Sequence, residues 1–176
     1  MIRLEPIKSE KVILREFELN DADQLYNNWG TDTDVSKYML WKNYNSVEDA
    51  INSIKYYIEC YKNDDSFKQY AIVYDNCVVG SINIVVSKRH RTGEIAYCLS
   101  KKYWRKGIMF EAISLLTDYY FNKYDLVRIS AEVIETNVAS RKLLEKCGFE
   151  LEGILKKKYF CKTNKHEDAY VFAIVK

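Results

Sequence analysis

The sequence predicts a mixed α+β domain. Segments with strand-like and helix-like patterns follow one another irregularly, instead of alternating as they do in a parallel α/β protein. The dipeptide Asp75-Asn76, between two β-rich segments, is a two-residue hairpin signal. The 176 residues are 48% hydrophobic and include one proline, with neither a linker-like stretch nor an internal repeat. A single domain over residues 1–176 is therefore expected.

The first third of the chain is expected to contain one strand and several helices. Asn20, followed by acidic residues, has the character of a helix N-cap. Ser46 and Asp49 match the capping-box pattern, and apolar residues at helical spacing follow them. The expected elements are a strand at Lys11–Phe17, a helix from Asn20 to Trp29, a loop with a short helix at Thr31–Trp41 and a helix from Ser46 to about Lys62.

The remainder of the chain is expected to be rich in strands, with two further helices. Gly148 follows a short amphipathic segment and suits the left-handed position that ends many helices. The expected strands are Lys68–Tyr74, Cys77–Ser87, Gly93–Leu99, Val127–Ile134, Glu150–Phe160 and His166–Val175, and the expected helices are roughly Gly107–Lys123 and Val138–Lys146. Together the segments predict a mostly antiparallel sheet of about seven strands flanked by about four helices.

Composition excludes several classes of protein. Because the sequence has no run of about 18 apolar residues and no signal-peptide-like apolar segment near its start, we expect a cytoplasmic protein without membrane contact. The five cysteines are odd in number and contain no C-x-x-C pair, which favours reduced, mostly buried thiols. With two histidines, no metal site is expected.

Charge is distributed unevenly along the chain. Residues 1–65 hold 13 acidic and 8 basic side chains, a net charge of −5, whereas residues 66–176 hold 12 acidic and 19 basic ones, a net charge of +7. Solvated faces that differ by chance would explain this. A cationic ligand bound by the first part and an anionic ligand bound by the second would explain it equally well.

The segment KKYWRKGIMFEA raises the question of an anionic ligand. Lys101, Lys102, Arg105 and Lys106 precede a helix that starts near Gly107, although a helix N-terminus ordinarily favours acidic residues. Exposed N–H groups beside four cations suit a phosphate or pyrophosphate. Neither of the familiar phosphate-loop patterns is present, and a surface turn with solvated lysines would account for the segment taken alone.

A second motif changes that interpretation. Asn137-Val138-Ala139-Ser140 begins a short helix that ends in Gly148-Phe149, about thirty residues after Gly107. With Glu94–Leu99 and Tyr103–Met109, this segment resembles the GNAT superfamily of acyl-CoA-dependent N-acetyltransferases, and within it the RimJ/RimL-like branch that acetylates protein N-termini. The resemblance extends over roughly residues 10–175.

The resemblance implies acetyl-CoA as co-substrate, no metal, and an amine as the acetyl acceptor. It implies that the backbone of Leu99 pairs with the pantetheine arm, that Ser140 is the general acid and that Glu94, directly or through water, is the base. Trp29, Tyr38, Met39, Trp41 and Tyr159 are expected to line the acceptor pocket, with a place in the apolar core as the alternative for the aromatic residues between positions 29 and 41. The residues implied to bind the co-substrate are Leu99, Trp104, Arg105, Lys106, Gly107, Ile108, Met109, Asn137 and Ser140.

Several residues depart from the pattern of the family. Trp104 stands where Gln or Arg is usual, and Met109 stands where Gly or Ala is commonest. Leu144 occupies the position at which many members carry a tyrosine acid, and Tyr159 occupies one at which this branch can place a carboxylate. Such departures also suit a catalytically idle acyl-CoA-binding module.

Two acidic residues allow alternative roles. Glu94 could instead form an ion pair with a neighbouring Arg such as Arg91, and Asp168 is interpreted as the partner of a lysine rather than a substrate ligand. Asp32 and Asp34 are expected to contribute to binding of a cationic acceptor. A homodimer is a family-level expectation.

The absence of an obvious strong base favours an α-amino acceptor. Deprotonating a lysine-like amine at pH 7 costs about 4–5 kcal/mol, whereas an α-amino group costs about 1 kcal/mol. We therefore expect acetylation of a protein or peptide N-terminus, with a small amine such as a polyamine, amino sugar or antibiotic as the alternative. A nucleic-acid partner is not expected, because Lys156–Lys158 lie on a strand-like segment without interleaved aromatic residues.

Overall fold

The computed structural model describes residues 4–176, which build one eight-stranded sheet in the order β1-β2-β3-β4-β5-β6-β8-β7. The strands are β1 (Ile7–Lys8), β2 (Val12–Arg15), β3 (Phe67–Tyr74), β4 (Cys77–Ser87), β5 (Thr92–Leu99), β6 (Arg128–Ile134), β7 (Glu150–Phe160) and β8 (His166–Val175). The α-helices are α1 (Ala22–Leu25), α2 (Thr33–Ser36), α3 (Val47–Asn63), α4 (Ile108–Lys123) and α5 (Val138–Lys146).

The predicted fold class is confirmed, and the short strand β1 is an addition to the expected seven strands. All neighbouring strands run antiparallel except β5 and β6, which are parallel. The hairpin between β3 and β4 turns at Asp75 and Asn76, whose φ angles of 50° and 59° are those of the expected two-residue turn. Gly148 ends α5 in the left-handed conformation, with φ of 86°.

The helix expected from Asn20 to Trp29 is built differently. Glu18, not Asn20, is the N-cap, because the carboxylate of the buried Asp21 accepts a hydrogen bond from the backbone N–H of Glu18 at 2.8 Å. The same carboxylate forms an ion pair with Arg15 at 2.7 Å. The segment then passes from a 3-10 turn (Leu19–Asp21) through α1 into a π-helical turn (Tyr26–Gly30).

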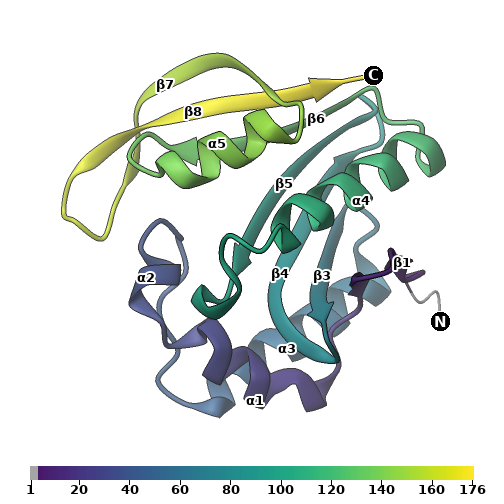
Figure 1. Ribbon diagram of the computed structural model, residues 1–176, viewed down its shortest axis with the longest axis vertical. Coiled ribbons are helices and arrows are strands. Elements are labelled where there is room, and N and C mark those ends of the chain that lie inside the picture. Colours follow the sequence, from purple (N-terminus) through teal and green to yellow (C-terminus); the bar gives the residue numbers. More distant parts are fainter. Residues whose placement is uncertain (1–3) are drawn as a thin grey trace.

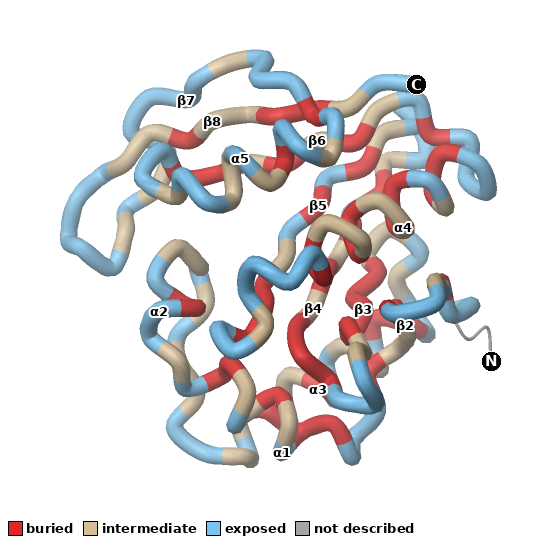
Figure 2. The backbone as a smooth tube through the Cα atoms, viewed as in Figure 1, coloured by how far each residue is buried: buried red, intermediate tan, exposed pale blue. Residues whose placement is uncertain are grey.

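Two apolar cores lie on opposite faces of the sheet. One packs α4 and α5 against the sheet and includes the fully buried Tyr70, Leu116 and Leu144. The other packs α1 and α3 against the opposite face around Ala50 and Ile54. Figure 2 shows buried residues concentrated along the central strands and on the inner side of α4, whereas β7, at one edge of the sheet, is almost entirely exposed.

The sheet opens between its two parallel strands. β5 and β6 pair only from Thr92↔Arg128 to Glu94↔Ser130, and beyond Glu94 the strand β5 pairs with β4 alone. Figure 1 shows β6, β8, β7 and α5 diverging from the rest of the sheet, with α2 at the open end. The opening is therefore a place where backbone groups of a central strand remain available to a ligand.

The structure also bears on the predictions about membrane contact and about the cysteines. No helix within residues 4–176 is long and apolar enough to cross a membrane. All five cysteines are free thiols, but the expectation that most are buried is wrong, since only Cys60 and Cys98 are buried.

Candidate active site

Two connected cavities occupy the gap between β5 and β6. The first has a volume of about 350 Å³ and lies between the diverging strands, and the second has a volume of about 730 Å³ and lies between the start of α4 and α5. Six residues line both cavities, so they mark the junction at which two ligands would meet. These residues are Tyr38, Met39, Tyr97, Cys98, Asn137 and Ser140.

The larger cavity is bounded by the turn that leads into α4. Gly107 is the N-cap of this helix, with φ of 79°, and Arg105 also has a positive φ of 62°. Within the described residues, no backbone carbonyl accepts from the amides of Arg105, Lys106 or Gly107. Together with the first amides of the helix, these N–H groups are free to bind an anion.

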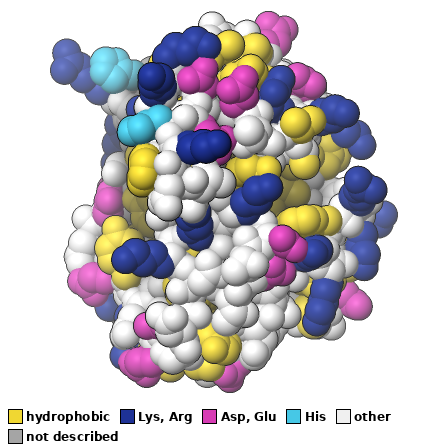
Figure 3. Space-filling view, turned by 90° about the vertical axis from the view of Figure 1, so that its left-hand side faces the viewer, with side chains coloured by type: hydrophobic (Ala, Val, Ile, Leu, Met, Phe, Trp, Pro, Cys, Tyr) yellow, Lys and Arg dark blue, Asp and Glu magenta, His cyan; other side chains and the backbone are white. Residues whose placement is uncertain are grey.

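Cations surround the same cavity. Arg105 lines it from the turn, and Lys142 and Lys146 line it from α5. Figure 3 shows Lys and Arg side chains along the right-hand edge of the open face. Lys106 is not among the residues that line the cavity, and its ammonium lies 5.2 Å from the centre of the Tyr103 ring. Of the two predicted cationic ligands, Arg105 is therefore the one in place.

The free edge of β5 continues from this turn towards the smaller cavity. Ser100 donates its amide to Val79 of β4 at 2.8 Å, and backbone groups alternate in direction along an antiparallel strand. The groups of Ile95, Tyr97 and Leu99 thus point into the gap. The Leu99 carbonyl accepts the indole N–H of Trp104 at 2.7 Å, so Trp104 closes the turn onto the strand end.

Apolar side chains form the inner wall of the larger cavity. Ile108 and Met109 line it and are 2% and 6% exposed, so Met109 packs into the core beneath the turn and does not block it. Leu144 is fully buried in the same core.

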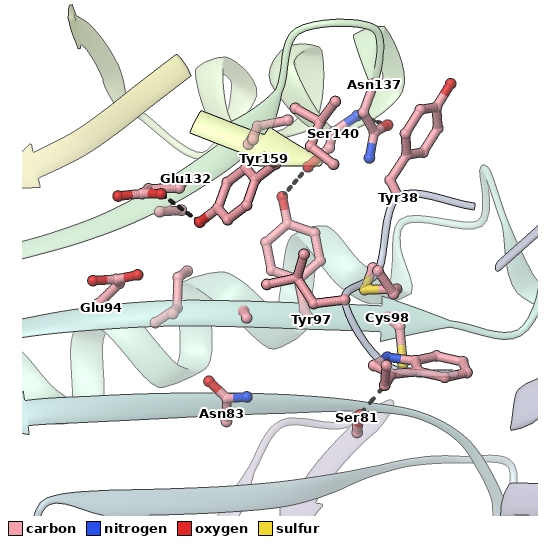
Figure 4. A pocket seen from close by; sticks show the side chains of 18 of the residues that line it. Tyr38, Ser81, Asn83, Glu94, Tyr97, Cys98, Glu132, Asn137, Ser140 and Tyr159 are labelled. Carbon is pink, nitrogen blue, oxygen red and sulfur yellow. Dashed lines mark hydrogen bonds between the residues drawn. The ribbon is translucent and has the colours of Figure 1, made fainter. Parts of the chain in front are cut away.

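Ser140 stands at the junction of the two cavities and is held from two sides. The Asn137 side chain caps α5 by accepting the backbone N–H of Ser140 at 3.2 Å. The hydroxyls of Ser140 and Tyr97 are 2.7 Å apart, as Figure 4 shows. Burial raises the pKa of the Tyr97 phenol, which is therefore neutral at pH 7 and able to donate to Ser140.

Two carboxylates face the smaller cavity from neighbouring strands. Glu94 of β5 and Glu132 of β6 both line it (Figure 4). Glu94 reaches the open cavity, yet its partial burial raises the pKa of its carboxyl, and the nearby Glu132 raises it further against the opposing effect of Lys158. Arg91 pairs with Asp125 at 2.6 Å, so the alternative ion pair for Glu94 is wrong.

Tyr159 is brought into the smaller cavity by an irregularity in β7. Its hydroxyl donates to Glu132 at 2.5 Å. Asp168 holds the irregular segment, since it accepts from the Lys156 ammonium at 2.7 Å and from the Lys157 amide at 2.8 Å. The predicted structural role of Asp168 therefore agrees with its contacts.

The predicted acceptor-pocket residues are not all in the cavity. Tyr38, Trp41 and Tyr159 line it, whereas Trp29 is 3% exposed and packs in the core under α1 and α3. The prediction for Trp29 is wrong, because its helical segment turns this indole towards the sheet. Tyr38 also donates to the Thr136 carbonyl at 3.2 Å, which bridges the open end.

The floor of the smaller cavity is polar. Gln69, Ser81 and Asn83 line it from β3 and β4, and the Asn83 amide donates to Gln69 at 3.3 Å. The acidic residues expected to attract a cationic acceptor are engaged elsewhere: Asp34 pairs with Lys101, and Asp32 caps α2. The carboxylates that face the acceptor side are instead Glu94 and Glu132.

Tyr97 and Glu132 were not among the predicted site residues. Both lie on correctly predicted strands next to the gap, Tyr97 on β5 and Glu132 on β6. The parallel register Glu94↔Ser130 brings Glu132 near Glu94, and no local sequence pattern contains that register. Among residues 4–176, no group of three or more His, Cys, Asp or Glu side chains is placed to hold a metal ion.

Comparison with known protein families identifies the family to which this chain is similar. Residues 11–150 match the model of the acetyltransferase (GNAT) domain. The chain is 31% identical over 172 residues to the N-acetyltransferase YoaA of Bacillus subtilis, covering 97% of this chain and 96% of that protein. It is 31% identical over 176 residues to the N-acetyltransferase p20 of Bacillus licheniformis, covering 98% and 97% of the two chains.

Solved structures agree with this assignment. A GNAT-family acetyltransferase from Bacillus anthracis is 28% identical and superposes with a TM-score of 0.86, over 97% of this chain and 98% of that one. RimL, the ribosomal L7/L12 α-N-protein acetyltransferase solved with coenzyme A, has a TM-score of 0.89 over 97% and 98% of the chains. Its identity of 20% shows the shared fold alone.

Proposed function

The chain belongs to the GNAT family of N-acetyltransferases, and we propose that it transfers the acetyl group of acetyl-CoA to the α-amino group of a protein or peptide. One observation carries the proposal. A cavity edged by free amides and cations joins, at Ser140 and Tyr97, a second cavity that holds two carboxylates. The first suits a diphosphate-bearing thioester, and the second suits an amine.

The residues of the larger cavity fit acetyl-CoA. The amides at 105–107 and the start of α4 would bind the diphosphate, with Arg105 supplying a charge-assisted contact. The unpaired edge of β5 at Ile95 and Tyr97 would pair with the amides of the pantetheine arm, as an added strand would. This arrangement directs the thioester to the junction beside Ser140.

Each reacting proton then has a residue near its path. Glu94 would accept a proton from the acceptor ammonium, directly or through water, and the neutral amine would attack the thioester carbonyl. The carbon–sulfur bond breaks as the amide forms. Ser140, supported by Tyr97, would donate its proton to the departing thiolate and regain one from the attacking nitrogen as this becomes the amide.

Competing acceptors differ in how strong a base they need. Spermidine and lysine side chains cost about 4–5 kcal/mol to deprotonate at pH 7, and an α-amino group costs about 1 kcal/mol. Glu94 is a carboxylate with only partial burial, and this favours the α-amine. The two carboxylates in the acceptor cavity would also suit a small polyamine, which is the second candidate.

The test is a competition analysed by mass spectrometry. The protein is incubated with acetyl-CoA and three acceptors: a Ser- or Ala-starting peptide with blocked lysines, an N-blocked lysine peptide, and spermidine. We expect one acetyl group on the first peptide alone. Acetylated spermidine or lysine would replace the proposal with the second candidate, and bound acetyl-CoA without any product would indicate an idle binding module.

A further inference from the structure

The two carboxylates of the acceptor cavity have unequal partners. Glu132 accepts a hydrogen bond from Tyr159 at 2.5 Å and lies 3.9 Å from the Lys158 ammonium. Glu94 has no side-chain hydrogen bond or ion pair within the described residues 4–176. The Glu132 carboxylate is therefore held by a hydroxyl and an ammonium, whereas Glu94 has no hydrogen-bonded partner and Lys158 acts on it only at longer range.

We propose that Glu132 and Tyr159 are positioning residues for catalysis: the hydrogen bond from Tyr159 holds the Glu132 carboxylate beside Glu94, and Glu94, which has no such partner, is the carboxylate that takes the acceptor's proton. This inference rests on the proposed function, since it concerns the base of that same reaction. The proton leaves the ammonium nitrogen and binds a Glu94 oxygen, and the nitrogen lone pair so released forms the new bond to the acetyl carbon.

The fold builds this arrangement through the irregular part of β7. The pairing of β7 with β8 shifts between Leu155 and Tyr159, and Lys157 adopts a positive φ of 52°. Asp168 fixes the irregularity through Lys156 and the amide of Lys157. As a result, the Tyr159 side chain crosses the intervening strand β8 and reaches Glu132 on β6.

The surroundings of Glu94 contain few other charges. The titratable or charged side chains that approach its cavity are Tyr97 and Cys98 of β5, Glu132 of β6, Lys158 and Tyr159 of β7, Tyr57 of α3 and Tyr38 after α2. β4 contributes the neutral Asn83. Two neighbouring carboxylates resist simultaneous ionisation, so a first proton binds the less stabilised one. Here that residue is Glu94, and its raised pKa makes it a better base for an amine near neutral pH.

The first experiment measures kcat/KM against pH for whichever acceptor the competition identifies. In the parent enzyme, activity falls as pH drops through the pKa of Glu94. In Glu132→Gln, the like charge is gone, so the pKa of Glu94 falls and this acidic limb of the profile should move to lower pH. Glu135→Gln removes the same charge just beyond the end of β6, outside the cavity, and should leave the limb in place. An unmoved limb in Glu132→Gln would overturn the proposal.

The second experiment asks whether Tyr159 acts through Glu132. Tyr159→Phe removes only the hydroxyl, so kcat should fall by about 13- to 160-fold, as expected for the loss of a hydrogen bond to a charged group. In the Glu132→Gln background the same change should have almost no further effect on kcat. Independent, multiplying effects would overturn the proposal.

The outcomes separate this inference from the proposed function. If spermidine is acetylated but the acidic limb of the pH profile still moves in Glu132→Gln, the proposal of an α-amino acceptor fails and the proposed roles of Glu94 and Glu132 stand. If the peptide is acetylated and Glu94→Gln retains the parent rate and limb, the acceptor assignment stands and the carboxylate pair fails.

Discussion

Replacing Ser140 with alanine tests which hydroxyl contacts the leaving sulfur. The change should remove only the side-chain donor, because Asn137 caps α5 through the backbone N–H of Ser140. Alanine is also well suited to a helix. The fold of the variant should therefore be retained, and the loss should lie in the chemical step.

The magnitudes expected for Ser140 and Tyr97 differ. Removing one donor to a developing anion costs about 2.7–4 kcal/mol, so kcat of Ser140→Ala should fall about 100- to 1000-fold. Tyr97→Phe removes a hydrogen bond of 2.7 Å between two neutral hydroxyls, worth about 0.5–1.5 kcal/mol, so kcat should fall between about 2- and 13-fold. The KM for acetyl-CoA should change little in both variants.

The assay is release of free CoA thiol, followed with a thiol-reactive dye at saturating acetyl-CoA, with urea unfolding as the control for folding. A fall in Tyr97→Phe larger than in Ser140→Ala would mean that the phenol itself protonates the sulfur. An unchanged kcat in Ser140→Ala would refute the assignment of Ser140 as the donor.

Three further changes have defined expectations. Asn137→Ala removes the cap of α5 and should lower the free energy of unfolding in urea by about 1 kcal/mol, with a reduced kcat because Ser140 loses its support. Leu144→Ala should lower it by about 2–5 kcal/mol in the same measurement, because this side chain is fully buried. Arg105→Ala should raise the KM for acetyl-CoA more than Lys106→Ala in initial-rate assays, since only Arg105 lines the larger cavity; equal effects would contradict this placement.

Local patterns predicted most of the fold correctly. The turn at Asp75 and Asn76, the cap at Ser46 and the end of α5 at Gly148 each depend on residues a few positions apart, so the sequence contains the whole interaction. The start of the first helix could not be predicted in the same way. There the buried ion pair between Arg15 and Asp21 makes Glu18 the cap instead of Asn20.

The same distinction holds in the site. Gly107, Asn137 and Ser140 belong to turn-and-helix motifs, and each lines the cavity that the motif predicts. Trp29 was misplaced because the aromatic content of a segment does not say which way a ring points. Glu132 was missed because its proximity to Glu94 follows from the parallel register of β5 and β6, which is set by packing over the whole sheet.

For Tyr159, the sequence predicted the place in the acceptor cavity but not the contact with Glu132. Its position in the sequence indicates that a carboxylate of the RimJ/RimL-like branch is replaced, and by itself this replacement favours an inactive protein. The irregularity of β7 directs the phenol onto Glu132, so a carboxylate still faces the acceptor cavity, but from β6 instead of β7. The acceptor cavity therefore has two carboxylates, Glu94 and Glu132, although the position that the family pattern assigns to a carboxylate is a tyrosine. Glu132→Gln should therefore lower the pKa of Glu94 but leave it raised, because the second carboxylate is removed while the partial burial of Glu94 remains.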